Sequence, residues 1–167
     1  MNNRDVDLDT VGAVIERILD AMPIAPFEPF RGARSIYPKV WCEWASFAIA
    51  LILERLGLGS WTIVSNRHRD DAAGHTWLEL RDESGGLIWT IDATLAQFPE
   101  WTAPFIGARP TPAYRPFSVS RYSGPWQAWP RLPWDDTYLG YAESLWTHLE
   151  GEEILRVLGP TLHSNGD

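Results

Sequence analysis

The sequence from residue 41 to residue 57 reads WCEWASFAIALILERLG, and it decides the fold. This stretch is apolar on nearly every side and is interrupted mainly by four polar residues: Glu43, Ser46, Glu54 and Arg55. A helix of this composition is buried on most of its faces, and the glycines at 57 and 59 favour its end there. We therefore predict a central core helix over residues 42–57, with Cys42, the only cysteine of the chain, at its N-terminus.

Two further helices are predicted, one on each side of the central helix along the chain. The first has apolar residues at the spacing of one helix face, namely Val11, Val14, Ile15, Ile18, Leu19 and Met22. This pattern predicts a helix over residues 9–22, capped by Asp9 or Thr10 and ended by Pro23. The second helix is predicted over residues 136–158 from two apolar stripes: Tyr138, Leu139, Ala142, Leu145, Trp146 and Leu149, then Ile154, Leu155 and Leu158.

Three strands are predicted after the central helix, over residues 61–66, 75–81 and 87–92. The second and third are joined by residues 82–86, which form a good hairpin loop. Alternation within the second strand places the side chains of His75, Trp77 and Glu79 on one side of the sheet, and those of Thr76, Leu78 and Leu80 on the other. The charged loop over residues 67–74 is expected to be exposed.

Residues 99–134 contain eight of the thirteen prolines and four of the ten tryptophans. Proline is poorly compatible with helix interiors and central strands, yet the aromatic content is too high for a disordered segment. We predict an ordered segment that wraps the core, with short edge strands around residues 113–122. The fold expected is one α+β domain over residues 1–167, with its core in residues 38–98.

Composition excludes several classes of function. The net charge of −8 argues against broad nucleic-acid binding, which needs clustered cations. A single cysteine forms no internal disulfide, and the N-terminus lacks the apolar run of a signal peptide. No stretch reaches the roughly 20 apolar residues of a membrane helix. A cytoplasmic soluble protein is therefore expected, with no nucleic-acid or membrane partner, although export by a machinery that reads no N-terminal signal stays open.

Three titratable residues stand out in this framework. Cys42 starts the core helix, His75 lies in the second strand, and Asp92 ends the apolar third strand. A thiol at a helix N-terminus favours the thiolate, an imidazole is the usual base, and a carboxylate can fix its tautomer. Each residue also has a structural interpretation: an inert buried cysteine, a hydrogen-bonded core histidine, and an aspartate that forms a local turn with Thr94.

Taken together, Cys42, the segment GHTWLEL at residues 74–80 and the segment IDAT at residues 91–94 resemble the core of the transglutaminase-like superfamily. The resemblance covers about residues 38–98 and implies a papain-like fold. It also implies that Cys42 is the nucleophile, His75 the base and Asp92 the orienting acid, and that an amide forms a thioester acyl-enzyme. Residues 37–41, YPKVW, depart from the glycine-rich approach of common crosslinking members, and the chain lacks the Arg-Gly-Gly lead of arylamine acetyltransferases.

Other residues are candidates for binding the substrate or the oxyanion. Oxyanion donors considered are the Cys42 backbone amide, the indoles of Trp41 and Trp44, and the Gln97 amide. Trp77 lies beside His75 in the strand, and a cluster of Trp126, Trp129 and Trp134 could line a groove for a peptide or flat ligand. A metal site among residues 67–75 is disfavoured because the spacing matches no compact zinc signature, and Gly85-Gly86 is a turn rather than a phosphate loop.

The function expected is cysteine-dependent acyl transfer on a peptide, protein or small amide, as a peptidase, deamidase or transamidase, with hydrolysis slightly favoured over crosslinking. This chemistry requires no cofactor. Alternatives are an arylamine-acetyltransferase-like enzyme, a non-catalytic protein that binds a peptide or partner on the same fold, or a structural subunit of a larger complex. The sequence gives no indication of the oligomeric state.

Overall fold

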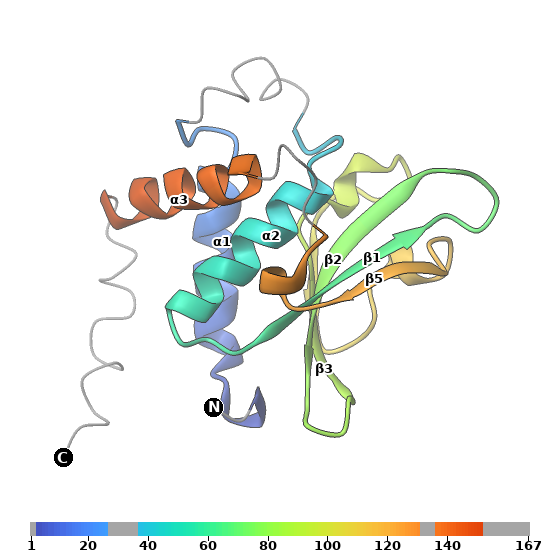
Figure 1. Ribbon diagram of the computed structural model, residues 1–167, viewed down its shortest axis with the longest axis horizontal. Coiled ribbons are helices and arrows are strands. Elements are labelled where there is room, and N and C mark those ends of the chain that lie inside the picture. Colours follow the sequence, from blue (N-terminus) through green and yellow to red (C-terminus); the bar gives the residue numbers. More distant parts are fainter. Residues whose placement is uncertain (1–2, 27–36, 131–135, 152–167) are drawn as a thin grey trace.

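The computed structural model describes residues 3–26, 37–130 and 136–151. Within these residues, three α-helices gather on one side of a five-stranded antiparallel sheet (Figure 1). The predicted α+β class is therefore confirmed. None of the helices in the described ranges is long and apolar enough to cross a membrane.

The central helix α2 spans Cys42–Arg55, and nearly all of its residues are buried. Its apolar side chains form the main core together with those of α1, α3 and the sheet. The helix ends two residues earlier than predicted, and Gly57 follows in the left-handed conformation with φ of 69°. A glycine adopts this conformation without steric cost and so terminates the helix.

Two helices pack around α2. The helix α1 spans Leu8–Ala21 and buries the predicted face that begins at Val11. Its cap is Asp7 rather than the predicted Asp9 or Thr10, because the Asp7 carboxylate accepts hydrogen bonds from the backbone amides of both of those residues. The helix α3 spans Asp136–Gly151. The rest of the predicted C-terminal helix, with its second stripe, lies outside the described residues.

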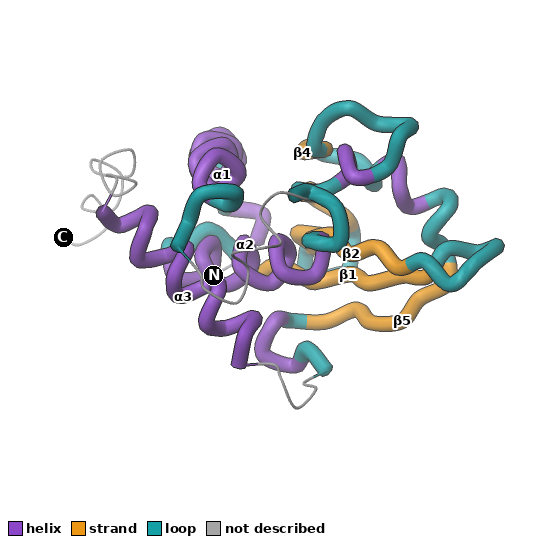
Figure 2. Tube along the Cα trace, turned by 90° about the horizontal axis from the view of Figure 1, so that it is seen from above, coloured by secondary structure: helices purple, strands orange, loops and turns teal. Residues whose placement is uncertain are grey.

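The sheet has the strand order β4-β3-β2-β1-β5, which Figure 2 shows from top to bottom. Its three central strands are β1 (Trp61–Arg67), β2 (Gly74–Arg81) and β3 (Leu87–Asp92), which agree with the predicted strands to within one residue at each end. The outer strands are β4 (Phe105–Gly107) and β5 (Val119–Gly124). The predicted hairpin is confirmed, with Leu78 of β2 paired to Ile91 of β3.

Both faces of the sheet are buried. Leu78 and Leu80 pack into the main core beneath α2, as the alternation predicts. On the other face, Trp77 packs with residues that follow β3 in a second apolar cluster: Val64, Leu95, Ala113 and Phe117. The segment after β3 therefore wraps the core as expected. Its strand around residues 113–122 is corrected to Val119–Gly124, because residues 112–114 form a 3-10 helix, and β4 was not predicted.

Candidate active site

The β2–β3 hairpin brings His75 and Asp92 together. Because Leu78 pairs with Ile91, Asp92 lies one residue further along β3, diagonal to His75 on the same face of the sheet. The His75 Nε2 atom lies 2.9 Å from both carboxylate oxygens of Asp92. Both side chains are fully buried. His75 and Asp92 therefore lie side by side, as predicted, and the carboxylate is the hydrogen-bond partner of Nε2.

Cys42 reaches the same imidazole from the N-terminus of α2. Its thiol lies close enough to the imidazole to contribute to the raised pKa of His75, and the residue is 8% exposed. The approach to the helix is unusual, because Val40 has a φ of 59°. A β-branched residue is strained in this left-handed region. The backbone therefore adopts a sharp turn just before Cys42, in a chain whose sequence places no glycine there.

The surroundings of His75 change its pKa in opposing ways. Burial lowers the pKa, whereas the charge of Asp92, its hydrogen bond, and the hydrogen bond and charge of Cys42 raise it. The effects that raise the pKa outweigh burial, and the pKa of His75 is about 9. The imidazole is therefore protonated at neutral pH, which places a positive charge beside the thiol and next to a carboxylate.

We predict that this raised pKa makes the protein less stable as the pH rises from about 6.5 to about 9. The unfolded chain releases the His75 proton near pH 6.5 and the folded chain near pH 9, so the folded state binds more protons between these values. The contribution of His75 to the free energy of unfolding is complete below pH 6.5 and is lost as the pH rises through 9. This loss amounts to roughly 3 kcal/mol. Urea unfolding of the wild type and His75→Gln across this range measures it. Parallel pH profiles for the two proteins would contradict the prediction.

Two residues outside the predicted triad contact it. The Thr111 hydroxyl donates a 2.7 Å hydrogen bond to Asp92 Oδ2 and is fully buried with it. Thr111 lies in the wrapping segment, and no local pattern in the sequence pointed to this role. The Gln97 side chain places Nε2 3.0 Å from His75 Nδ1, while its Oε1 accepts from the Val40 amide at 3.3 Å. Gln97 therefore bridges the imidazole and the backbone just before Cys42, and its role as an oxyanion donor stays a prediction.

Two cavities are lined by neighbours of Cys42 and His75. The first, of about 250 Å³, adjoins α2 and is lined by Glu43, Ser65, Arg121, Tyr122, Trp129, Pro130 and Tyr138. The second, of about 230 Å³, is lined by residues that include Phe98, Phe117 and Trp101. The Phe98 and Phe117 rings lie 4.9 and 5.3 Å from the His75 ring, centroid to centroid, and so form the wall between this cavity and the imidazole.

The structure does not gather the predicted substrate-binding tryptophans around Cys42. Trp41 is 2% exposed and packs edge-on between Tyr37 and Tyr141. Trp77 is fully buried, and its indole donates to the Glu79 carboxylate. Both indoles therefore belong to the packed interior, and we withdraw their assignment as substrate contacts.

The remaining tryptophans divide between the cavity and the outer part of α2. Trp129 lines the first cavity, and Trp44 stacks on Tyr138, another residue of that cavity. Trp126 instead donates from its indole to Glu54, which lies twelve residues after Cys42 and so about 18 Å further along the helix. Trp126 is thus withdrawn as a substrate contact. Trp134 lies outside the described residues.

No group of three or more His, Cys, Asp or Glu side chains in the described ranges is placed to hold a metal ion. The two histidines of the predicted 67–75 segment have separate partners. His68 lies 3.5 Å from Asp71, whereas His75 is bound to Asp92.

Comparison of the chain with protein-family models, with curated proteins and with solved structures found no match. The transglutaminase-like resemblance is therefore a hypothesis that depends on Cys42, His75, Asp92 and the segments around them.

Proposed function

We propose that this protein is a papain-like thiol enzyme that transfers an acyl group from an amide through a thioester on Cys42. The observation that carries the proposal is the buried chain of contacts from Cys42 to His75 and from His75 to Asp92. The thiol, the base and the orienting acid come from a helix start and two adjacent strands. A nucleophile, its base and a third group that orients the base are the minimal set for covalent acyl transfer.

The geometry supports the following sequence of steps. The Cys42 thiolate attacks the amide carbonyl carbon to give a tetrahedral oxyanion. The protonated His75 then gives its Nδ1 proton to the leaving nitrogen, the carbon–nitrogen bond breaks, and the amine departs. Water, or a second amine, attacks the thioester while His75 accepts its proton, and cleavage of the carbon–sulfur bond regenerates the thiolate. Asp92 holds Nε2 throughout, which leaves Nδ1 as the nitrogen that exchanges protons.

Gln97 fits the role of the side-chain donor to the oxyanion. Its amide can donate to His75 Nδ1 only while that nitrogen carries no proton. A proton on Nδ1 removes this acceptor, so in the protonated form of His75 one amide N–H group is left for the substrate while Thr94 Oγ1 can accept the other. The backbone amide of Cys42, at the start of α2, is the second candidate donor. The indole N–H of Trp41 was also a candidate donor, but Trp41 is too deeply buried to reach a substrate.

The test is acylation by p-nitrophenyl acetate, an activated ester that needs no knowledge of the natural substrate. The wild type is expected to release p-nitrophenolate in a burst of about one equivalent per chain, with the acetyl group located on Cys42 by mass spectrometry. Cys42→Ala should abolish the burst, and Ser84→Ala, in the exposed β2–β3 loop, should retain it. A folded wild type that shows no acetyl group on Cys42 would contradict the proposal and favour a non-catalytic binding protein.

A further inference from the structure

The first cavity lies beside the start of α2, next to the proposed nucleophile. Glu43, which lines it, directly follows Cys42. Arg121 lines it from β5, and its Nη1 lies 2.9 Å from the position that a Cβ atom would occupy on Gly74. Gly74 directly precedes His75. Position 74 faces the same side of β2 as Thr76, the side that α2 covers, so the cavity is reached from the Cys42 end of the site and is positioned to hold a part of the substrate that extends from the thiol along this side.

A β-bulge presents Arg121 to this cavity. In the pairing of β1 with β5, Ser65 is opposite Tyr122 and Asn66 is opposite Ser120, so Arg121 is an additional residue between two consecutive pairs. Such a bulge bends the strand and redirects its side chains. The guanidinium lies over the backbone of Gly74, where a Cβ atom would make it shift. The bulge thus directs the Arg121 side chain across β1 toward the start of β2.

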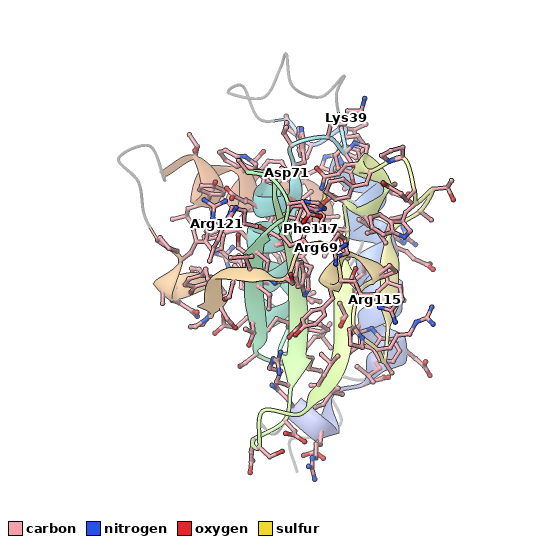
Figure 3. The ribbon with its side chains drawn as sticks, turned by 90° about the vertical axis from the view of Figure 1, so that its right-hand side faces the viewer. Lys39, Arg69, Asp71, Arg115, Phe117 and Arg121 are labelled. Carbon is pink, nitrogen blue, oxygen red and sulfur yellow. The ribbon has the colours of Figure 1, made fainter. Side chains whose placement is uncertain are left out.

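This cation has no partner within the described part of the protein. Arg121 forms no ion pair and no side-chain hydrogen bond with any described residue. Glu43 lines the same cavity but receives a 2.7 Å hydrogen bond from Tyr138 rather than pairing with Arg121. Figure 3 shows Arg121 on the same face as Lys39, Arg69 and Arg115. Asp71 is labelled on the same face, so the cations there are interspersed with carboxylates, and Arg121 is the cation that lines the first cavity.

We propose that Arg121 binds a carboxylate of the substrate and so selects an acidic amide for the Cys42 reaction. The guanidinium is planar and donates two parallel hydrogen bonds to a carboxylate. A phosphate would suit Arg121 equally well, but its second negative charge would be repelled by Glu43 across the same cavity. A singly charged carboxylate therefore fits the pair of residues better. This inference depends on the proposed function, because it assigns the substrate class of that same site.

The experiment measures how fast Cys42 is alkylated by pairs of N-alkyl iodoacetamides that differ only at the far end, a carboxylate in one and a primary amide in the other. Chains of two, three and four methylenes place that end at different distances from the sulfur. For each protein, the carboxylate rate divided by the amide rate gives a preference that cancels changes in thiol reactivity. Arg121→Gln is the test variant, Arg121→Lys keeps the charge, and Arg115→Gln is the matched control.

Arg121→Gln is expected to lower the preference for the carboxylate probe about five- to tenfold at the best chain length, as expected for loss of a charge-assisted hydrogen bond at a partly solvated site. Arg121→Lys should lose only part of it. Arg115→Gln removes the same charge from an exposed arginine that lines a different cavity, and should change the preference less than about twofold. Thermal unfolding checks that each variant is folded.

Equal preferences in Arg121→Gln and Arg115→Gln would overturn this inference while leaving the proposed function intact, provided that plain iodoacetamide still reacts with Cys42 in a His75-dependent way. If Cys42 of the folded wild type reacts with none of the probes, or reacts independently of His75, the proposed function fails and the substrate assignment fails with it. The two failures are thus distinguished by the iodoacetamide rate alone.

Discussion

His75→Ala is expected to lower the rate at which iodoacetamide alkylates Cys42 at pH 6 by about two orders of magnitude. In the wild type, the imidazole beside the thiol has a pKa of about 9, and a neighbouring imidazolium is what favours a thiolate over a thiol. A cysteine without such a partner has a pKa of about 8.5, and only about 0.3% of it is thiolate at pH 6. Because the thiolate is the nucleophile, the rate follows this fraction.

The measurement is the second-order rate constant from about pH 5 to pH 10, read by mass spectrometry of the Cys42 peptide. His68→Ala is the matched control, since His68 bonds to Asp70 and Asp71 in the β1–β2 loop rather than to Cys42. Both variants should match the wild type after unfolding in guanidinium chloride. Wild-type and His75→Ala rates that agree at pH 6, or a wild-type rate that rises only near pH 8.5, would show that Cys42 is not activated.

The sequence is sufficient to predict His75 and Asp92 as a pair because their geometry is local. A five-residue loop forces β2 and β3 into an antiparallel hairpin, and the two-residue period of a strand then determines which side chains share a face. Cys42 is predictable for a different reason. The apolar composition of α2 requires burial, and a cysteine in its first turn therefore lies at the margin of the core rather than on the surface.

The support that the wrapping segment gives to the site could not be predicted. Thr111 is nineteen residues from Asp92, and the intervening chain has no periodicity from which its path can be inferred. The same reason explains the omission of β4, which has three residues and is fixed only by its pairing to β3. Arg121 was missed because a bulge shifts the alternation of β5, and a bulge leaves no mark in the sequence beyond the strand that contains it.

Trp41 and Trp77 were wrongly assigned as substrate contacts because residue type does not determine the direction of a side chain. An indole is equally suited to a core and to a ligand groove. Trp41 directly precedes the nucleophile in sequence, yet the helix start turns its ring into the interior between Tyr37 and Tyr141. Trp129 is far from Cys42 in sequence but lines the cavity next to it. Sequence proximity to a candidate nucleophile is thus weaker evidence for a substrate contact than position relative to the sheet.

Asp92→Ala is expected to destabilise the protein by about 3–5 kcal/mol at pH 7, a large share of the roughly 5–15 kcal/mol that stabilises most domains. The carboxylate is fully buried, and it accepts hydrogen bonds from both His75 and Thr111. Its removal leaves a buried imidazolium without its counter-charge and a buried hydroxyl without an acceptor. The imidazole then loses its proton, so the variant should also lose most of the fall in stability between pH 6.5 and 9.

Three variants separate the charge of Asp92 from its hydrogen bonds in urea unfolding. Asp92→Asn keeps the volume and one acceptor oxygen, and should cost about 1–3 kcal/mol. If Asp92→Ala does not fold, Asp92→Asn still gives a measurable change in the free energy of unfolding. Thr111→Val removes one hydrogen bond from the same carboxylate and should cost about 1 kcal/mol, with the pH dependence retained. A cost below about 1 kcal/mol for Asp92→Ala would mean that His75 is not charged in the folded protein, and the thiolate–imidazolium pair would then lose its physical basis.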